Sequence, residues 1–302
     1  MKKRAIITGA TGFIGSHLVR ALLSLDWDIA LIVRPESVIH KLKAISFKAK
    51  IFIFNENPAE LIDFFENFKP DVVFHLASCF LVDHEVSNIK DIVNSNILFG
   101  TYLLEAMLKA NCKKIINTGS TWQHFDDEKN NPANLYAASK NAYVEILNYY
   151  YHAYGFEIIS LELFDTYGPH DSRRKIVNLL IHSVSNNIQI DLSPGLQKIN
   201  FVYIDDIVEA YLVSAKCLLE RDQKSFDVYT VGGNEVLTLK EVVKTIELVS
   251  NKKCAASFSK RPYRTREVMK PWSKGKQLPN WEAKVNFKTG ILNILKADKE
   301  ET

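Results

Sequence analysis

Short apolar runs alternate with longer amphipathic segments along the first half of the chain. The runs are rich in Ile, Val, Leu and Phe, and they span residues 5–8, 29–33, 50–54, 71–77, 114–119 and 158–164. The segments between them follow a helical period over residues 17–25, 58–68, 91–110 and 135–155, and the last of these ends at Gly155, a plausible C-cap. Apolar strands separated by helices predict an α/β fold with a doubly wound parallel sheet, covered by helices on both faces.

The alternation weakens after residue 166. The pattern there predicts a helix near 175–186, a strand near 200–204 and helices near 206–219 and from 237 onward. No low-complexity linker or internal repeat marks a boundary. We therefore expect a first domain over 1–165, with returning segments near 196–235. A smaller, discontinuous α/β lobe is expected to be built from 166–195 and 236–302.

Composition narrows the class of protein. Hydrophobic residues make up 47% of the chain and charged residues 24%, which is typical of a soluble globular protein. A net charge of +3 gives no reason to expect nucleic acid or a membrane as partner. The cysteines are scattered and the histidines lack metal-binding spacing, so we expect no metal site and a reducing, cytoplasmic location. No signal peptide or membrane span is expected.

A glycine-rich turn lies between the first strand and the first helix. Residues 8–15 read TGATGFIG. Glycine tolerates positive φ and lets a diphosphate approach the backbone, and a helix N-terminus offers free N–H groups. A glycine trio alone is weak evidence, but a strand before it and a helix after it are the context that dinucleotide binding requires. We therefore expect a Rossmann-type domain with a substrate-binding lobe, and a cofactor held by Gly9, Thr11, Gly12, Phe13, Ile14 and Gly15.

The end of the second strand bears on the choice of cofactor. Val33 stands about 20 residues after the glycine turn, where a dinucleotide fold places the acid that binds the adenosine ribose. Valine cannot accept that hydrogen bond, whereas Arg34 beside it can pair with the 2′-phosphate of NADP. We expect NADP (as NADPH), with NAD possible if Arg34 stacks on the adenine instead. Asn55, after the third strand, is expected to meet the adenine edge.

Tyr136 and Lys140 lie one helical turn apart in YAASK, so both side chains share one helix face. An ammonium near a phenol favours the phenolate, so we expect Lys140 to lower the Tyr136 pKa from about 10. Tyr136 could then exchange a proton with a substrate oxygen, while Lys140 binds the nicotinamide ribose. Ser120, at the end of the fifth strand, is expected to stabilise charge on the same oxygen. Taken alone, the Tyr–Lys pair is also compatible with a surface feature.

The number and order of these motifs resemble the extended short-chain dehydrogenase/reductase family, the NAD-dependent epimerases and dehydratases. Further segments that match the family pattern are VFHLAS (73–78), NILFGT (96–101), TYGP (166–169) and DDIVEAY (205–211). The resemblance implies that the cofactor is also lined by Leu76, Ala77, Ser78 and Asn96. It further implies that Ser120, Tyr136 and Lys140 form a catalytic triad.

Members of this family act on nucleotide-activated sugars as 4-epimerases, 4,6-dehydratases and 4-keto reductases. Dehydratases carry Asp-Glu after the triad Ser/Thr, and fucose-type epimerase-reductases carry Cys there. Thr121 and Trp122 stand at these places, which disfavours both reactions. Thr121 and Trp122 are expected to face the substrate. Cys79 could do so too, with a buried structural thiol as the alternative.

The positions expected to bind a substrate diphosphate depart from the family pattern. In GLQKINF (195–201), Ile199 stands where the family usually has Arg, and Lys198 would point to the other face of the strand. Arg264 matches the C-terminal Arg of the family, so we expect it to bind the diphosphate. The alternative is that residues 260–266 form a solvated basic loop.

The chain is also similar to the CDP-abequose and CDP-paratose synthase group of nucleotide-sugar 4-ketoreductases, in INTGS (116–120), YGPHD (167–171), GLQKINFVYIDD (195–206) and RTREVM (264–269). A reductase consumes hydride and usually draws on NADPH, which Arg34 favours. The first hypothesis is therefore an NADPH-dependent reductase of a nucleotide-activated 4-keto-6-deoxy sugar, active as a homodimer. Two alternatives stay open: a nucleotide-sugar epimerase that retains its cofactor, and a non-catalytic NADP-sensing module.

Overall fold

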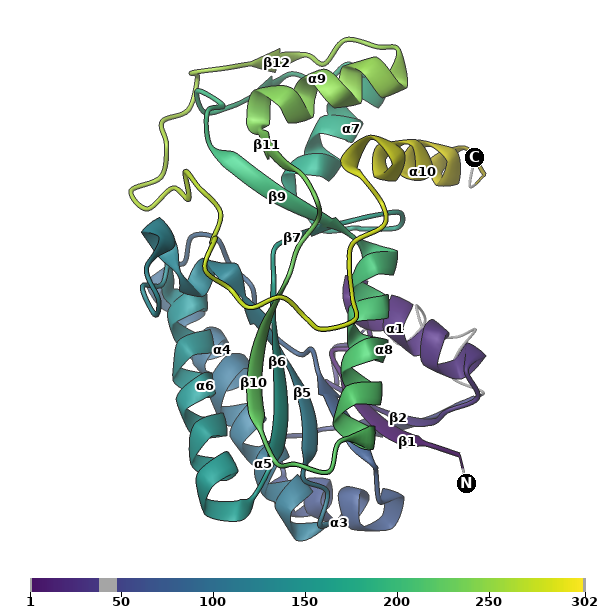
Figure 1. The fold of residues 1–302 in the computed structure, drawn as a ribbon. Coiled ribbons are helices and arrows are strands. Elements are labelled where there is room, and N and C mark those ends of the chain that lie inside the picture. The colour runs from purple at the N-terminus through teal and green to yellow at the C-terminus, as the bar shows by residue number, and fades with distance from the viewer. Residues whose placement is uncertain (1, 38–47, 301–302) are drawn as a thin grey trace.

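A seven-stranded parallel sheet forms the centre of the larger part of the molecule (Figure 1). The computed structural model describes residues 2–37 and 48–300 of the 302-residue chain. The strands lie in the order β10–β6–β5–β4–β1–β2–β3. Their bounds are β1 Arg4–Thr8, β2 Asp28–Val33, β3 Ala49–Ile53, β4 Val72–His75, β5 Lys114–Ser120, β6 Glu157–Leu163 and β10 Phe226–Val231. The strand order reverses between β1 and β4, where a doubly wound sheet opens a crevice at its carboxyl edge.

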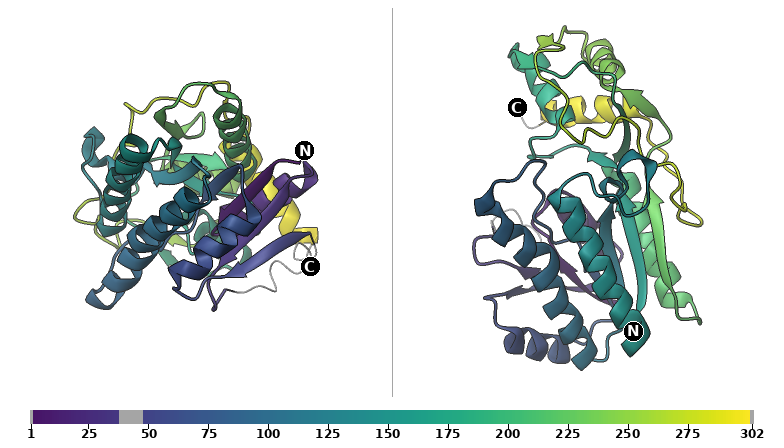
Figure 2. Two further views of the ribbon diagram at one scale, coloured as in Figure 1. Left: turned by 90° about the horizontal axis from the view of Figure 1, so that it is seen from below. Right: turned by 90° about the vertical axis from the view of Figure 1, so that its left-hand side faces the viewer.

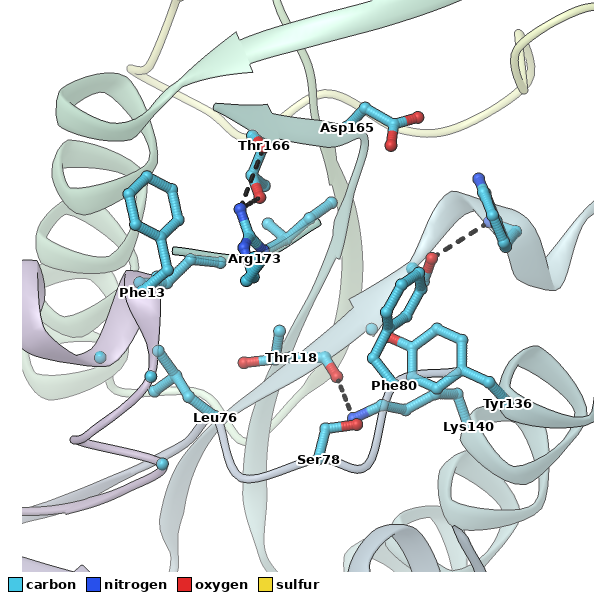
Figure 3. Close-up of a pocket in the computed structure, with 18 of the residues that line it drawn as sticks. Phe13, Leu76, Ser78, Phe80, Thr118, Tyr136, Lys140, Asp165, Thr166 and Arg173 are labelled. Carbon is cyan, nitrogen blue, oxygen red and sulfur yellow. Dashed lines mark hydrogen bonds between the residues drawn. The ribbon is translucent and has the colours of Figure 1, made fainter. Parts of the chain in front are cut away.

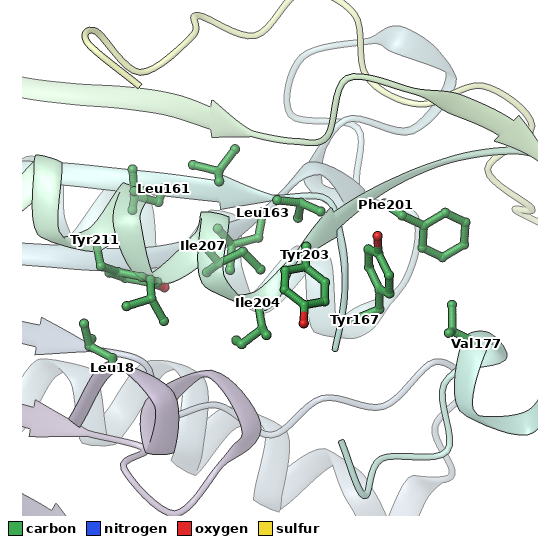
Figure 4. Packing of buried hydrophobic residues seen from close by; sticks show 14 of the residues in the cluster. Leu18, Leu161, Leu163, Tyr167, Val177, Phe201, Tyr203, Ile204, Ile207 and Tyr211 are labelled. Carbon is green, nitrogen blue, oxygen red and sulfur yellow. The ribbon is translucent and has the colours of Figure 1, made fainter. Parts of the chain in front are cut away.

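Helices cover both faces of this sheet (Figure 2). One face carries α1 (Phe13–Ser24) and α8 (Ile204–Glu220). The other carries α3 (Pro58–Phe68), α5 (Phe99–Lys109) and α6 (Leu135–Tyr154). Each face has its own buried apolar cluster. The larger cluster continues from α8, through Tyr167 and Phe201, into the smaller group of elements beyond the sheet (Figure 4). Burial of both sheet faces explains why the strands are apolar throughout rather than alternating.

A smaller group of elements lies beyond the carboxyl edge of the sheet (Figure 1). It contains a three-stranded sheet in the order β11–β9–β7 and the short pair β12–β8. The strands are β7 Asp165–Tyr167, β8 Ile190–Asp191, β9 Lys198–Tyr203, β11 Val236–Thr238 and β12 Ala256–Ser257, and the helices are α7 Ile176–Asn186, α9 Leu239–Ser250 and α10 Phe287–Glu300. Between β9 and β11 the chain returns to the large sheet as α8 and β10. The division into domains predicted from the sequence stays a prediction.

The predicted Rossmann-type α/β fold is confirmed, and its first six strands form within a few residues of their expected bounds. The predicted C-cap is present, because Gly155 ends α6 in the left-handed region at φ +74°. The helix expected over 91–110 is interrupted: α4 (Ile89–Val93) continues through a π-helical turn, η3 (Asn94–Leu98), into α5. Within residues 2–37 and 48–300, no helix has both the length and the apolar character needed to cross a membrane.

Candidate active site

An open cleft lies at the carboxyl edge of the large sheet (Figure 3). Phe13 and Leu76 stand on one side of it, and Tyr136 and Lys140 project from α6 on the other. The lining consists of Gly9, Gly12, Phe13, Ile14, Gly15, Leu76, Ser78, Phe80, Thr118, Gly119, Ser120, Trp122, Tyr136, Lys140, Leu163, Phe164, Asp165, Thr166, Arg173 and Lys175. All three predicted catalytic residues and most of the glycine turn therefore share one cavity.

The glycines of the turn have different physical roles. A Cβ on Gly9 would lie 2.7 Å from the Ala77 backbone nitrogen, and one on Gly15 only 2.2 Å from the Gly9 carbonyl oxygen. Gly9 therefore allows the turn to pack closely against the loop after β4, and Gly15 allows α1 to pack closely against the turn itself. Gly12 differs: it is exposed, it is the N-cap of α1, and no side chain caps the helix there.

The loop after β4 is held by a buried threonine that the sequence analysis did not identify. The Thr8 hydroxyl oxygen accepts hydrogen bonds from the backbone N–H groups of Leu76 and Ala77, at 3.2 and 3.1 Å. It lies 2.8 Å from Nδ1 of His75. Burial lowers the pKa of His75 to about 3, so its ring is neutral. Because the Thr8 oxygen already accepts two hydrogen bonds, its O–H donates to Nδ1 of His75. The segment His75–Ala77, which belongs to VFHLAS (73–78), is thus positioned by hydrogen bonds from Thr8 of β1.

These features fit a nicotinamide dinucleotide. The free N–H groups at the start of α1, beside the exposed Gly12, face the cleft and suit a diphosphate. Arg34 and Asn55 follow the ends of β2 and β3 and are both exposed, but neither lines the cleft. Thr11 and Ala77 also lie outside the lining.

Asn96 lies behind the cleft wall rather than in it. Its side-chain oxygen accepts from the Cys79 N–H at 2.7 Å and the Ser78 hydroxyl at 3.0 Å. Its amide donates to the Cys79 carbonyl oxygen at 3.1 Å and to the Ser139 hydroxyl at 2.9 Å. Asn96 belongs to the π-helical turn η3, and it is buried. Its hydrogen bonds fix the loop that carries Ser78.

The triad residues come from β5 and from the first turns of α6. Ser120 is the last residue of β5, and the helix begins after Asn134, whose side chain caps the Ala137 N–H at 2.9 Å. Tyr136 and Lys140 are both buried. The Lys140 ammonium donates to the Thr118 carbonyl oxygen at 3.0 Å, which ties α6 to β5.

The expected effect of Lys140 on Tyr136 is wrong. Burial raises the pKa of Tyr136 to about 12, and the Ser120 and Ser78 hydroxyls with Arg173 only partly oppose this. The Lys140 ammonium lies 5.9 Å from the centre of the Tyr136 ring and is directed to the Thr118 carbonyl instead. Burial also lowers the pKa of Lys140, to about 8. Tyr136 is therefore a neutral phenol at pH 7.

Two cations in the cleft, Arg173 and Lys175, were missed from the sequence. Arg173 forms a fork with Asp171 at 2.7 and 2.8 Å, and it donates to the Thr166 hydroxyl at 2.9 Å. The Lys175 ammonium lies 3.6 Å from Asp165 and 4.0 Å from the centre of the Phe80 ring, and burial lowers its pKa. The signal was the run RRK at 173–175, one residue after YGPHD (167–171).

The residues predicted to bind substrate are dispersed. Trp122 lines the cleft, whereas the buried Thr121 hydroxyl donates to the Leu163 carbonyl oxygen at 3.4 Å. Cys79 is half-buried, and burial raises its thiol pKa. Arg264 lines a neighbouring pocket that also includes Trp122. Its guanidinium is engaged by both carboxylate oxygens of Glu267, at 2.9 Å each.

Among residues 2–37 and 48–300, no group of three or more His, Cys, Asp or Glu could hold a metal ion.

The chain is similar to known proteins over nearly its whole length. The chain is 29% identical over 296 residues to CDP-abequose synthase of Yersinia pseudotuberculosis, covering 97% of this chain and 99% of that protein. It is 27% identical over 327 residues to human dTDP-D-glucose 4,6-dehydratase, covering 99% and 90%. The structure of Thermus thermophilus UDP-glucose 4-epimerase in complex with NAD has the same fold, with a TM-score of 0.82 at 22% identity over 99% of this chain and 100% of that one.

Residues 5–232 match the model of the NAD dependent epimerase/dehydratase family. The resemblance predicted from the motifs is thereby confirmed. The chain belongs to the NAD dependent epimerase/dehydratase family and is a nicotinamide-dependent enzyme of the extended short-chain dehydrogenase/reductase type.

Proposed function

We propose that this enzyme is an NADPH-dependent reductase of nucleotide-activated 4-keto-6-deoxy sugars. The observation that carries the proposal is that Ser120, Tyr136 and Lys140 line one cleft together with the glycines of the turn. Likeness over nearly the full length to a CDP-abequose synthase supports a nucleotide-sugar substrate.

The proposed chemistry assigns a separate role to each triad residue. A nicotinamide dinucleotide bound at the glycine turn would supply the hydride for C4 of the sugar. Tyr136 donates its phenolic proton to the carbonyl oxygen as negative charge develops there. The Ser120 hydroxyl donates a hydrogen bond to the same oxygen and stabilises that charge. Lys140 holds the helix against β5 and offers its remaining N–H groups to the ribose hydroxyls.

A protonated Tyr136 suits the general-acid role that the proposed reduction requires. A general acid must carry its proton at the working pH, and a phenol with a pKa near 12 does so at pH 7. A 4-epimerase would first need the same tyrosine to remove a proton from a sugar hydroxyl, which requires the phenolate. Epimerisation is therefore the competing reaction that an experiment must separate from reduction.

Lys175 is the better candidate for the substrate diphosphate. Both cations line the cleft, but Arg173 is already engaged by Asp171 and Thr166, whereas the Lys175 ammonium forms a longer ion pair, with Asp165 at 3.6 Å. An ammonium with free N–H groups can pair with a phosphate. Lys175 would thus take the role of the Arg that the family usually has at the position of Ile199. Arg264 in the adjoining pocket would be a second cation for the diphosphate.

The cofactor form rests on Arg34. It directly follows the end of β2 and is exposed, so its guanidinium is available to a 2′-phosphate. We propose NADPH as the reductant, with NAD as the alternative.

The test is a panel of CDP-, GDP-, dTDP- and UDP-linked 4-keto-6-deoxy sugars, each mixed with NADPH and followed by the loss of NADPH absorbance. A reductase consumes NADPH in proportion to product, and Tyr136→Phe lowers the rate of this consumption by at least about 10²-fold. Conversion of sugar without net NADPH loss, by protein that carries cofactor through desalting, would instead identify an epimerase. Tight NADP binding with no conversion of any sugar would favour the third hypothesis, a non-catalytic NADP-sensing module.

We also propose a homodimer in the cytoplasm. Tyr149 and Tyr154 lie on α6 and are 56% and 37% exposed, which suits a helix-to-helix interface. Sedimentation of the wild type and of Tyr149→Glu tests the dimer, because a buried carboxylate at the interface would shift the protein to monomer. A wild type that sediments as a monomer contradicts it. Cell fractionation tests the location.

A further inference from the structure

The turn after Ser120 carries two consecutive buried polar side chains that no step of the proposed reaction uses. Thr121–Gln123 form the short 3-10 helix η4. Gln123 and His124 are only 2% and 6% exposed. Burying such groups destabilises a protein unless they are hydrogen-bonded. Both are hydrogen-bonded, and each reaches a different neighbouring element.

Gln123 connects Ser120 to the helix that carries the other triad residues. Its side-chain oxygen accepts from the Ser120 backbone N–H at 2.9 Å. Its amide donates to the side-chain oxygen of Asn141 at 2.7 Å. Asn141 directly follows Lys140 on α6. One side chain therefore spans the gap between the end of β5 and α6, at the level of Tyr136 and Lys140.

His124 connects the same turn to β6. Its Nε2 lies 2.9 Å from a carboxylate oxygen of Glu162. Its Nδ1 accepts from the Asn130 N–H at 3.2 Å, so the ring proton lies on Nε2 and is donated to the carboxylate. Both side chains of this pair are almost fully buried. Glu162 stands opposite Gly119 in the β5–β6 register.

Gly119 lies where the two connections meet. A Cβ at this position would lie 3.1 Å from both the Gln123 side-chain oxygen and Cγ of Glu162. The two side chains therefore close over the residue directly before Ser120. The His124 ring also stacks on the ring of Trp272, with ring centroids 4.3 Å apart. The turn is thus fixed from the helix, from the strand and from the C-terminal segment.

We propose that Gln123 and His124 are positioning residues that hold the Ser120 hydroxyl against the Tyr136 phenol. The proposal rests on the proposed function, in which these two hydroxyls share the substrate oxygen. The Ser120 hydroxyl is near enough to the Tyr136 phenol to lower its pKa, and it accepts a hydrogen bond from the Trp122 N–H at 3.3 Å. A serine side chain at a strand end can turn between rotamers, so its direction depends on a fixed backbone. The two connections provide that fixed backbone.

The first test compares two substitutions of one residue. Gln123→Met keeps the length but removes both hydrogen bonds. Gln123→Glu keeps an acceptor for the Ser120 N–H, and the Asn141 amide can turn to donate to it. We expect Gln123→Met to lower kcat about 10-fold or more, the loss of roughly one hydrogen bond in the transition state, with the NADPH Kd unchanged. Gln123→Glu should restore most of kcat.

A matched control removes a buried hydrogen bond from the same two strands at another place. Asn117 on β5 donates to the Ser160 hydroxyl on β6 at 2.9 Å. Ser160→Ala should lower the melting temperature and leave kcat unchanged. If Gln123→Met, Gln123→Glu and Ser160→Ala instead lose kcat in proportion to the fall in their melting temperatures, the effect is one of stability alone and the proposal is wrong.

The histidine connection is tested by a double-mutant cycle. His124→Phe keeps a ring against Trp272 but leaves the Glu162 carboxylate unpaired, and Glu162→Leu removes that carboxylate. We expect each single variant to lower kcat and the double variant to be no worse than the poorer single one. Additive losses would overturn the role of the pair.

Crystal structures of the wild type and Gln123→Met separate this proposal from the proposed function. We expect the Ser120 hydroxyl to turn away from the Tyr136 phenol in the variant and to keep its wild-type direction in Ser160→Ala. An unchanged Ser120 rotamer in Gln123→Met would overturn the proposal, whether or not a sugar substrate has been found. If the wild type reduces no keto-sugar nucleotide, the proposed function fails, and the structures alone decide the positioning role.

Discussion

The Lys140 ammonium donates a hydrogen bond to the Thr118 carbonyl oxygen at 3.0 Å, and only 2% of the Lys140 residue is exposed. A cation so deeply buried has lost most of its hydration, which is why its pKa falls to about 8. In the unfolded chain the same group has a pKa near 10.5. The protein thus accepts a destabilising charge at the place where the cofactor ribose and the catalytic phenol are expected to meet.

We predict that Lys140→Met is more stable than the wild type at pH 7 and has no reductase activity. Between pH 8 and 10.5 the unfolded wild type binds more protons than the folded one, so wild-type stability rises with pH across this window. At pH 7, Lys140→Met should have a free energy of unfolding higher than that of the wild type by on the order of 2 kcal/mol, a figure that already subtracts the lost hydrogen bond to Thr118. This difference should therefore shrink as the pH approaches 10.5.

Urea unfolding at pH 7, 9 and 10.5 measures this difference. Lys244 is exposed on α9, so Lys244→Met is the matched control and should show no such pH dependence. A Lys140→Met variant less stable than the wild type at pH 7 would show that the ammonium stabilises the fold instead.

We predict that Tyr136→Phe lowers kcat about 10²- to 10⁴-fold, the range for loss of a general acid, and leaves NADPH affinity unchanged. Because burial raises the Tyr136 pKa to about 12, its ionisation should not appear below about pH 10. The tyrosinate absorbance of the wild type minus that of Tyr136→Phe, titrated from pH 7 to 11, measures this directly. A difference signal with a midpoint near 8 would restore the sequence-based view that Lys140 activates Tyr136.

The backbone of the site could be predicted from the sequence because it depends on local patterns. Apolar runs located β1 and β4, the TGATGFIG turn located the start of α1, and the Tyr–Lys spacing placed two triad residues on one face of α6. β10, an edge strand of the seven-stranded sheet, was missed from the sequence. Only its last residues are buried, and its run FDVYTV is partly polar.

The electrostatics could not be predicted in the same way. The direction of an ammonium and the burial of a phenol depend on which elements pack around them, and the Thr118 carbonyl and the Phe80 ring come from distant parts of the chain. Lys175 was missed for the same reason: only the path of the chain after β7 brings it over the cleft. The buried turn at Gln123 has no recognisable motif.

We predict that Arg34→Glu shifts the cofactor preference from NADP toward NAD. The carboxylate would repel a 2′-phosphate and could accept a hydrogen bond from a ribose hydroxyl, so the ratio of Kd values should change about 10-fold or more. Arg20→Glu reverses an exposed charge on α1 and should leave the ratio unchanged. Equal titrations with NADPH and NADH measure both variants. Unaltered selectivity in Arg34→Glu would remove the argument for NADPH.

We predict that Lys175→Met raises the KM for the sugar nucleotide about 10- to 100-fold, changes kcat little, and leaves NADPH binding intact. The ammonium faces the cleft beside Phe80 and contributes uniform binding to a substrate phosphate, so its loss should weaken substrate and transition state alike. Arg174 is its exposed neighbour and does not line the cleft, so Arg174→Met should leave KM unchanged.

The result also discriminates between the two candidate cations. Arg264 is held by Glu267 in the adjoining pocket, so Arg264→Met should raise KM less than Lys175→Met if Lys175 binds the diphosphate. A free sugar without the nucleotide should lose nothing further in Lys175→Met, because it has no phosphate to bind. If kcat falls and KM stays constant, Lys175 acts on the reacting centre through Phe80 and Tyr136 rather than on the phosphate.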